Sequence, residues 1–387
     1  MIVWMNENID NIYIHVPFCD GRCIYCSFYS IADGGDVLIS EYIPAMGKEM
    51  AMRSLEFGRL RPKTVYIGGG TPTVLSPATL QSLLSLLTDD MDMSAVTEFT
   101  VEANPGTLTT EKARILKMYG VNRLSIGAQS LDDRLLEFLR RRHNAAQVSA
   151  AITIAREAGF ANISIDLIAA LPGVSRTEWD MTLAKAIELA PDHLSVYCLT
   201  VEDRTRLSTM VASGTTSLPD GEEQADALDA AMGILATAGF IRYEISNYAK
   251  HGRECQHNVA FWEGKDYLGI GASAASRLNL SRSTNDPDIH RYIAALNSGK
   301  TAPCETELLT AEKDISERLA FKFRMTAPVD IEAFARAHGK TGSELKTKWL
   351  EALHGLKSAD LVSHKGSYWQ LTEKGINMAD QVCGELL

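Results

Sequence analysis

The first half of the chain alternates short apolar runs with amphipathic stretches. The apolar runs are rich in Val and Ile and are bounded by Gly, Pro or polar residues, as strands are. Strands are predicted at residues 12–16, 64–67, 99–102, 123–126, 163–168 and 194–199. Helices are predicted between them, near residues 39–60, 77–87, 110–119, 132–139, 145–158 and 176–190. Six strand–helix units in succession predict an α/β fold with a parallel sheet or barrel.

The second half of the chain has a different pattern. Residues 203–300 are expected to be more helical, with the clearest helix at 221–238. Further helices at 311–323, 331–338 and 344–352 precede two short strands around residues 365 and 366, which predicts a small winged-helix-like domain. A winged helix suggests DNA binding by analogy only, and no basic patch supports it here, so a lid or partner surface is expected. We divide the chain into residues 1–205, 206–305 and 306–387.

Three cysteines lie within eight residues, directly after the first predicted strand. Cys19, Cys23 and Cys26 form a C-x3-C-x2-C pattern on the loop that begins at Pro17. Free cysteines are normally scattered, small apolar residues, so such a cluster indicates a metal site. Thiolates are the ligands of iron–sulfur clusters, and three protein ligands leave one iron of a 4Fe–4S cluster open for a substrate or cofactor.

Other interpretations of these cysteines remain open. A structural zinc site normally takes four ligands from two separated pairs, and His15 would supply at most the fourth ligand here. A disulfide would leave one of the three cysteines over and suits an oxidising compartment. The remaining cysteines are dispersed and bring the count to an odd seven, a pattern typical of a reducing compartment.

Composition and charge exclude some classes of function. The chain has 387 residues, 45% hydrophobic and 22% charged, which is enough for one large core and a smaller domain. The net charge of −11 leaves no basic footprint for nucleic acid. Residues 1–11 have no basic region before a long apolar stretch, as a signal peptide would, and no apolar run reaches the length of a membrane span. We therefore expect a cytoplasmic protein without an integral membrane segment.

The wider context of the cysteines resembles a known family. The sequence Y-I-H-V-P-F-C-x3-C-x-Y-C-x-F-Y-S is similar to the radical S-adenosylmethionine (SAM) superfamily, and to its subgroup of oxygen-independent coproporphyrinogen III oxidases and HemW heme chaperones. This resemblance implies a partial (β/α)6 barrel with a C-terminal domain. It also implies a 4Fe–4S cluster on the three cysteines, whose open iron binds SAM for reductive cleavage to a 5′-deoxyadenosyl radical. In barrels the chemistry lies at the carboxyl ends of the strands.

The resemblance assigns SAM binding to a glycine-rich segment. Gly69, Gly70 and Thr71 belong to G-G-G-T-P, directly after the second predicted strand, and this segment holds the amino group of SAM in the superfamily. Glycines allow a close approach of backbone to ligand, although a triple glycine is also typical of a tight turn. Tyr13 and Tyr25 flank the cysteines, where the family places aromatic side chains against the cofactor; packing of the loop is the alternative.

Polar residues after the later strands are assigned to SAM by the same resemblance. Glu102 ends the third strand, where a carboxylate accepts hydrogen bonds from ribose hydroxyls or is simply solvated. Asp166 lies inside an apolar strand and needs a partner, because unpaired burial is costly. The family assigns SAM contacts to both and to Gln129. It assigns the SAM carboxylate to Arg141, which otherwise reads as part of a solvated run of three arginines.

A second motif follows in residues 243–262. The segments Y-E-I-S-N-Y-A and H-N-V-A-F-W resemble signatures of the HemW branch, in which the histidine, here His257, is implicated in heme binding. Imidazole is a natural axial ligand for heme iron, and the flanking Phe261 and Trp262 would cover the porphyrin. The alternative is a histidine hydrogen-bonded within a packed aromatic corner.

Two departures bear on function. The oxidase branch carries a fourth cysteine where this chain has Phe28, as HemW proteins do, whereas the HemW branch usually has a histidine where this chain has Ala275. We expect a HemW-like chaperone that transfers heme to an acceptor protein, with flavodoxin or ferredoxin as electron donor. The alternative is a radical SAM enzyme acting on a tetrapyrrole or another substrate, by decarboxylation, methyl transfer or ring opening.

Overall fold

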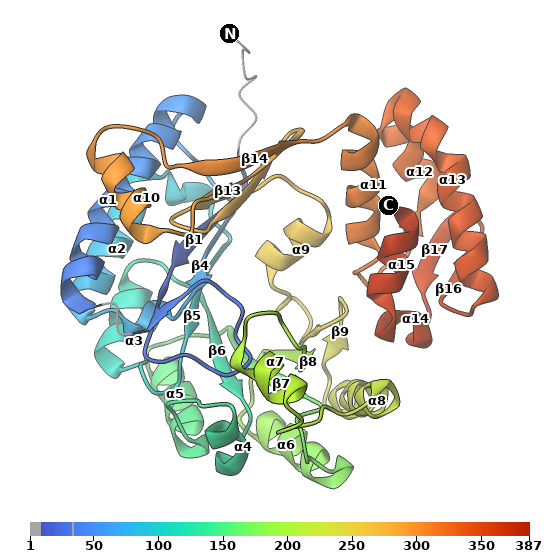
Figure 1. Cartoon of the computed structure of the whole chain (residues 1–387), viewed down its shortest axis with the longest axis horizontal. Coiled ribbons are helices and arrows are strands. Elements are labelled where there is room, and N and C mark those ends of the chain that lie inside the picture. The colour runs from blue at the N-terminus through green and yellow to red at the C-terminus, as the bar shows by residue number, and fades with distance from the viewer. Residues whose placement is uncertain (1–8, 33–34) are drawn as a thin grey trace.

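The centre of the molecule is a nine-stranded sheet. The structure is a computed structural model that describes residues 9–32 and 35–387. The strand order is β11-β1-β4-β5-β6-β7-β8-β10-β9 (Figure 1). Six neighbouring strands run parallel and match the six predicted ones: β1 (Asn11–Val16), β4 (Thr64–Gly69), β5 (Glu98–Ala103), β6 (Arg123–Gln129), β7 (Ile163–Ala169) and β8 (His193–Cys198). The predicted α/β fold is confirmed.

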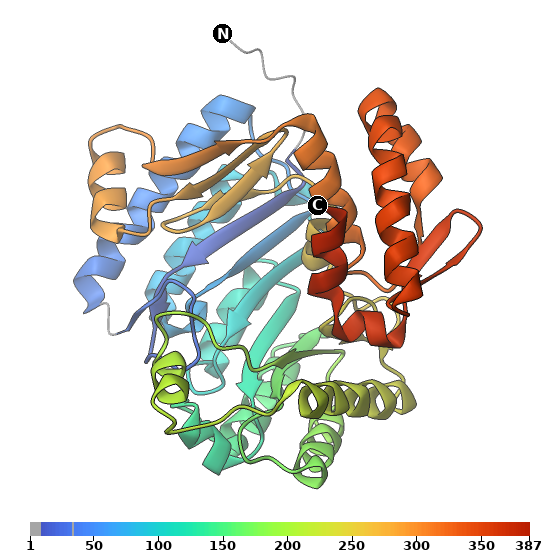
Figure 2. The same ribbon diagram turned by 45° about the vertical axis from the view of Figure 1, so that its right-hand side comes forward.

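Helices connect the parallel strands and cover the outer side of the sheet (Figure 1, Figure 2). Several begin at a polar residue whose side chain accepts a backbone N–H of the first turn, such as Ser76, Thr109 and Asn144. The helices are α1 (Gly35–Phe57), α2 (Pro77–Asp90), α3 (Thr110–Met118), α4 (Asp133–Phe138), α5 (Ala145–Glu157) and α6 (Arg176–Glu188). All six predicted helical regions are therefore present.

Side chains alternate along the parallel strands between two environments. On β5, Phe99 and Val101 belong to the main hydrophobic core under the helices, and Thr100 and Glu102 point the other way. The other strands repeat this pattern. The second side of the sheet, called the inner face below, carries Asn11, Tyr13, His15, Thr64, Tyr66, Glu98, Thr100, Glu102, Arg123, Ser125, Ser164, Asp166, His193, Ser195 and Tyr197. A polar inner face enclosed by an apolar shell is suited to hold polar ligands.

Three short strands extend the sheet beyond the six units. β11 (Leu268–Ile270) pairs in parallel with β1, and β10 (Asn247–Ala249) pairs antiparallel with β8 and with β9 (Ile241–Arg242). The segment 203–300 is thus less helical than expected, because strands of two or three residues are too short to produce a periodic pattern. Its helices are α7 (Arg206–Ala212), α8 (Gly221–Thr237), α9 (Gln256–Trp262) and α10 (Ile289–Asn297).

Two smaller sheets accompany the main one. A three-stranded sheet contains β12 (Ala275–Leu278), β13 (Ser281–Asn285) and β14 (Cys304–Leu308). The other is the parallel pair β2 (Phe18–Cys19) and β3 (Ile31–Ala32), which joins the two ends of the cysteine loop. Because of this pairing, the chain leaves the sheet at the carboxyl end of β1 and returns to the same place after the cysteine loop.

The C-terminal unit has a hydrophobic core of its own around Trp349 and Trp369. Its sheet has the order β15-β17-β16, so the predicted two-stranded wing gains a third strand, and the predicted helix at 344–352 is the middle of a longer one. The elements are α11 (Ala311–Lys322), β15 (Val329–Asp330), α12 (Ile331–Ala337), α13 (Gly339–Ser358), β16 (Val362–Lys365), β17 (Tyr368–Leu371), α14 (Glu373–Asn377) and α15 (Ala379–Leu386). The division of the chain at residues 205 and 305 stays a prediction.

The expectations about membranes and targeting have different outcomes. In the part of the chain that the structure describes, no helix has the length and apolarity to cross a membrane. The expectation about a signal peptide concerned residues 1–11, of which residues 1–8 lie outside the described residues.

Candidate functional site

The cysteine loop leaves the sheet at the carboxyl end of β1. Cys19 lies on β2, and Cys23 and Cys26 follow on the loop before β3. The N–H of Ile24 donates to the carbonyl of Leu139 at 3.2 Å, which anchors the middle of the loop near the end of α4. Across residues 9–32 and 35–387, no three His, Cys, Asp or Glu side chains stand in metal-coordinating positions. The loop therefore gathers the thiols at one edge of the sheet without closing a metal site by itself.

The chemistry of the three thiols fits a cationic cofactor. Burial raises the pKa of Cys19 and of Cys26, and the charge of Cys23 raises both further. Arg141 donates from Nη1 to Sγ of Cys23 at 3.4 Å, and the hydroxyl of Thr71 lies 3.6 Å from Sγ of Cys19. Thiols whose pKa is raised in this way become thiolates when a metal binds them. The donor set is the one that an iron–sulfur cluster requires.

Close contacts within the protein shape the glycine-rich segment at the end of β4. A Cβ on Gly68 would lie 2.7 Å from the Glu102 carboxyl, and a Cβ on Gly69, whose φ is +103°, would strike the His15 ring. A Cβ on Gly70 would lie 2.5 Å from the carbonyl oxygen of Phe18. Each glycine is therefore required by close packing, whatever it also does for a ligand. The segment brings Glu102 next to the start of the cysteine loop.

Glu102 lies on the inner face near the end of β5. The hydroxyl of Tyr66 donates to its Oε1 at 2.8 Å, and the N–H of Gly69 donates to its Oε2 at 3.2 Å. Burial, helped by the charge of Asp166, raises the pKa of Glu102 to about 7, although both hydrogen bonds act in the opposite direction. At neutral pH the carboxyl group is thus close to half-protonated, and it can either donate to or accept from a hydroxyl group.

Asp166 has partners on the inner face, as its place in an apolar strand requires. The hydroxyls of Ser125 and Ser164 donate to the carboxylate at 3.2 Å. Burial raises the pKa of Asp166 despite these bonds. The charges of Asp166 and Glu102 affect each other, so the structure brings these two predicted residues together on neighbouring parts of one face.

Arg141 and Gln129 meet over Gly127 at the end of β6. The strand has an irregular register between Ile126 and Gln129, and Gln129 has a φ of +66°, in the left-handed region. A Cβ on Gly127 would lie 3.0 Å from Nε2 of Gln129 and 3.5 Å from Nη2 of Arg141. Nη2 of Arg141 donates to the Gly127 carbonyl at 2.7 Å, but its Nε is buried without a partner among the residues that the structure describes. A buried guanidinium with a spare donor is suited to an anionic ligand.

The two tyrosines occupy different places. Tyr13 lies on the inner face of β1, where its hydroxyl is 3.0 Å from Nδ1 of His15 and its ring stacks on Tyr66 with 6.3 Å between centroids. Nε2 of His15 faces the Tyr29 carbonyl at 3.1 Å, so both ring nitrogens of His15 have hydrogen-bond partners. Tyr25 lies in the cysteine loop itself, and its pKa is raised by burial. Only Tyr25 is a direct neighbour of the thiols.

His257 lies at the other end of the parallel strands. Glu98, the first residue of β5, accepts the N–H of Gln256 at 2.8 Å, the N–H of His257 at 3.1 Å and the Sγ–H of Cys255 at 3.3 Å. Nδ1 of His257 is 2.8 Å from Oγ1 of Thr64, the first residue of β4. The structure therefore separates His257 from the cysteine loop by the length of the inner face.

The surroundings of His257 set its charge and differ from expectation. Burial and the charge of Arg123 lower the pKa of His257 to about 4, so the ring is neutral at physiological pH. Phe261 and Trp262, expected to cover a porphyrin, pack instead against Phe321 of α11 at 5.5 and 6.2 Å between centroids. These ring contacts are part of the contact between α9 and α11 of the C-terminal unit.

Several residues of these sites were not predicted from the sequence. Tyr66 lies between Tyr13, Glu102 and His257, and Thr64 and Glu98 hold α9. A signal for them existed, because every second residue of each strand is polar and faces the same side. The predictions concentrated on the carboxyl ends of the strands, and among mid-strand or early positions they included only Tyr13 and Asp166.

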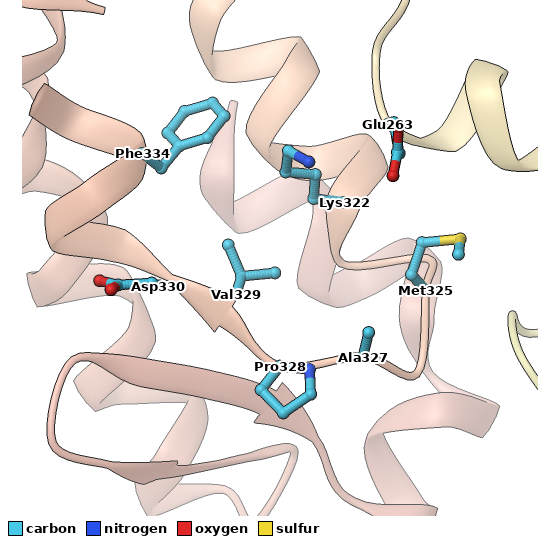
Figure 3. Close-up of a pocket in the computed structure, with 8 residues that line it drawn as sticks. All are labelled: Glu263, Lys322, Met325, Ala327, Pro328, Val329, Asp330 and Phe334. Atoms are coloured by element: carbon cyan, nitrogen blue, oxygen red, sulfur yellow. The ribbon is translucent and has the colours of Figure 1, made fainter. Parts of the chain in front are cut away.

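A cavity of about 280 Å³ is lined by residues of the C-terminal unit and by Glu263, none of which belongs to the inner face. It opens in the C-terminal unit between α11 and α12, lined by Lys322, Val329 and Phe334, with Glu263 at the end of α9 on one side (Figure 3). None of the predicted site residues lines this cavity. The candidate site is therefore the inner face and the cysteine loop.

Comparison with known proteins relates almost the whole chain to one family. Residues 13–186 match the family model of the radical SAM superfamily, and residues 309–377 match that of the HemN C-terminal domain. The heme chaperone HemW of Bacillus subtilis is 35% identical over 97% of this chain and 98% of that protein. Heme chaperone HemW of Lactococcus lactis is 34% identical over 99% and 98%, respectively.

Among solved structures, coproporphyrinogen III oxidase (HemN) from Escherichia coli, a radical SAM enzyme, superposes with a TM-score of 0.86. The match covers 99% of this chain and 91% of that chain at 24% sequence identity, and this likeness concerns the fold. Together with the two matched family models, it confirms the radical SAM fold with a C-terminal domain.

Proposed function

Because the chain belongs to the HemW family of radical SAM proteins, we propose that it is a heme chaperone that binds heme and transfers it to an acceptor protein. The observation that carries the proposal is the full-length relationship to proteins named heme chaperone HemW. The residue at the fourth cysteine position of the oxidase branch, Phe28, is consistent with it. Family membership also implies a 4Fe–4S cluster and SAM.

We assign the cluster to Cys19, Cys23 and Cys26. The raised pKa values of Cys19 and Cys26 and the closed loop between β2 and β3 support this assignment, because bound metal would stabilise the thiolates. When bound, the cluster supplies the electron for reductive cleavage of SAM. The protein around it holds the loop in place and keeps a positive charge, that of Arg141, beside Cys23.

We assign SAM to the carboxyl half of the inner face. The spare Nε of Arg141 would bind the SAM carboxylate, and the half-protonated Glu102 would bind the ribose hydroxyls. The other residues proposed to contact SAM are Tyr13, Tyr25, Gly69, Gly70, Thr71, Gln129 and Asp166. The support is their common location on or beside one polar face.

His257 is the proposed heme ligand. A neutral imidazole with one nitrogen hydrogen-bonded and the other available is the form that binds heme iron. The hydrogen bond from Nδ1 to Thr64 and the lowered pKa support this role. Phe261 and Trp262 are engaged with α11, so we do not assign the covering of the porphyrin to them.

Partners follow from the same proposal. The outer edge of the cysteine loop is open, with Phe28 69% exposed, which would allow an electron donor such as flavodoxin or ferredoxin to approach the cluster. The heme acceptor would be another protein. The seven free thiols suit the reducing cytoplasm, and the net charge of −11 does not suit nucleic acid.

One observation favours the alternative of a radical SAM enzyme acting on a tetrapyrrole or another substrate. The carboxyl half of the inner face carries the whole set of residues that would bind SAM for reductive cleavage. Glu102 and Asp166 on this face have pKa values raised by burial, and perturbed carboxyl groups of this kind are typical of catalytic sites. Decarboxylation, methyl transfer or ring opening would then be the reaction.

The deciding experiment combines binding and turnover. The protein with reconstituted cluster is incubated anaerobically with SAM, a reductant and heme, and the products are identified by mass spectrometry. The chaperone predicts a stable heme complex and recovery of unmodified heme. Formation of 5′-deoxyadenosine in step with a modified tetrapyrrole would support the enzyme instead.

A variant tests the ligand within the same assay. His257→Ala should lose the Soret band of bound heme while its iron and sulfide content stays at the parent level. His251→Ala is the matched control, because His251 is exposed on the loop before α9. An unchanged Soret band in His257→Ala would contradict the ligand assignment.

A further inference from the structure

Three residues from distant parts of the chain form a hydrogen-bonded row at the amino end of the strands. Asn11 begins β1, Thr64 begins β4 and His257 lies on α9. Oγ1 of Thr64 is 2.9 Å from Oδ1 of Asn11 and 2.8 Å from Nδ1 of His257. Nδ2 of Asn11 is 3.0 Å from the carbonyl oxygen of Asp266. The row therefore ends on a group that can only accept a hydrogen bond.

The direction of every hydrogen bond in this row follows from that end. The Asp266 carbonyl accepts, so the amide group of Asn11 must direct its NH2 toward it and its oxygen toward Thr64. The Thr64 hydroxyl then donates its only proton to Asn11. Its lone pair faces His257, so Nδ1 of His257 must carry the proton and donate it.

Fixing the proton on Nδ1 determines the state of the other ring nitrogen. A neutral imidazole carries one proton, so Nε2 of His257 keeps its lone pair. Within the described residues Nε2 has no hydrogen-bond partner, and it is not among the polar atoms that are both buried and unpaired. It thus keeps an open side toward a ligand. The ring of Tyr66, at 5.2 Å between centroids, restricts the tilt of the imidazole.

We infer that Asn11 and Thr64 are positioning residues that hold His257 in the Nδ1–H tautomer, so that Nε2 is the nitrogen that binds heme iron. This inference rests on the proposed function for its ligand. The tautomer itself is a property of the heme-free chain. A histidine that ligates a metal commonly donates its other ring N–H to a fixed acceptor, which orients the ring and raises its basicity.

The first test reads the tautomer directly. In heme-free protein with ¹⁵N-labelled histidines, the imidazole nitrogens of His257 are identified by their loss in His257→Gln. The parent should show a protonated Nδ1 and an unprotonated Nε2. Thr64→Val removes the acceptor, and Asn11→Ala frees the hydroxyl to donate to Nδ1, so both should move the proton toward Nε2. A parent protonated at Nε2 would overturn the inference without any variant.

The second test measures heme affinity by titration of the Soret band. Thr64→Val should weaken ferric heme binding by about tenfold, the typical effect of losing a partner of a metal ligand. Thr64→Ser keeps the hydroxyl and should bind like the parent. Thr100→Val is the matched control, because Thr100 is buried on the same face and its hydroxyl has no partner.

The outcomes separate the two proposals. Unchanged heme affinity in Thr64→Val together with lost affinity in His257→Ala would refute the positioning role alone. Unchanged affinity in both variants would refute His257 as the ligand, while the tautomer measurement still decides the hydrogen-bonded row. Equal loss in Thr64→Val and Thr64→Ser would also refute the inference, because the hydroxyl would then be irrelevant.

Discussion

The two ends of the inner face differ in how completely their polar groups are paired. At the amino end, Glu98 accepts three donors from the start of α9, and both ring nitrogens of His193 have hydroxyl partners at 2.8 and 2.9 Å. At the carboxyl end, Nε of Arg141 has no partner and the thiols of Cys19 and Cys26 have raised pKa values. The acidic and imidazole groups of the amino end are mostly paired within the protein, although Nε of Arg123 has no partner among the described residues, whereas the carboxyl end combines an unpaired guanidinium N–H with a group of thiols.

This difference indicates what kind of ligand group each end can bind. A buried polar group without a partner costs free energy, so a set of such groups persists where a ligand completes it. The carboxyl end has the composition of a cofactor site, because it offers thiols and a spare guanidinium N–H together. The amino end offers fewer open atoms, chiefly Nε2 of His257 and Nε of Arg123. The amino end is suited to offer one ligating nitrogen, that of His257, on a ring whose orientation is fixed by hydrogen bonds.

We call the carboxyl end of the inner face, with the cysteine loop, the open end, and the amino end, where Glu98 binds the start of α9, the closed end. The largest effect is expected at the open end, when its three thiols are removed. The triple variant of Cys19, Cys23 and Cys26 to Ala should lose all iron and sulfide after anaerobic reconstitution, where the parent should hold about four of each, as a 4Fe–4S cluster does. Iron, sulfide and absorption near 400 nm measure the result. Heme binding should persist, because His257 lies at the other end. A full cluster in the triple variant would show that the three cysteines do not hold it and that the carboxyl end is not the cluster site.

The next effect tests the closed end. Glu98→Ala would leave three donors of α9 without an acceptor and would leave the buried Arg123 beside one negative group fewer. Removing one partner of a buried charged network costs about 3–5 kcal/mol, so the melting temperature should fall by several degrees or more. Heme affinity should fall with it, since α9 carries His257.

The matched control for Glu98 is Glu188→Ala, an exposed carboxylate at the end of α6. Its melting temperature should stay within a degree or two of the parent, because exposed substitutions have small effects. The same small change in Glu98→Ala would show that the amino end is not closed by this carboxylate.

A smaller effect is expected from a glycine at the boundary of the open end. A Cβ on Gly70 would lie 2.5 Å from the Phe18 carbonyl oxygen and 2.7 Å from that of Val16, both backbone atoms. Gly70→Ala should therefore cost about 1–3 kcal/mol of stability and reduce cluster content, because Phe18 directly precedes Cys19.

Gly233→Ala provides the contrast for this substitution. Gly233 lies within α8 with no atom within 4 Å of its would-be Cβ, and alanine there should stabilise the helix by up to about 1 kcal/mol. Thermal melting and iron content are measured for both variants. Equal changes in melting temperature and iron content in the two variants would mean that Gly70 is not in close contact with the backbone before Cys19.

The sequence predicted the open end far better than the closed end, for a physical reason. The cysteines, the glycine segment and Glu102 lie directly after strands, and local patterns identify strand ends. At the closed end, Glu98 meets α9 and Thr64 meets His257 across 159 and 193 residues of chain. No local pattern specifies such contacts. The contact of Phe261 and Trp262 with Phe321 could not be predicted for the same reason, since Phe321 lies on a helix distant in sequence, and their role beside a porphyrin stays a prediction.

The smallest effect concerns the proton on Glu102 and sharpens the account of the open end. Its pKa is about 7 in the folded chain, against 4.5 for an ordinary glutamate, so between these values the folded state binds more protons than the unfolded state. The free energy of unfolding should therefore fall as pH rises from 5 to 8. Screening at this half-buried site reduces the contribution to about 2 kcal/mol.

Glu102→Gln removes this pH-dependent contribution, so the stability of the variant relative to the parent should grow over this range. Denaturant unfolding of both proteins at pH 5 and pH 8 measures the difference, with Glu137→Gln, an exposed residue of α4, as a control that should follow the parent. A constant offset between Glu102→Gln and the parent would show that Glu102 is ionised throughout, and the proposed ribose contact would then be to a plain carboxylate.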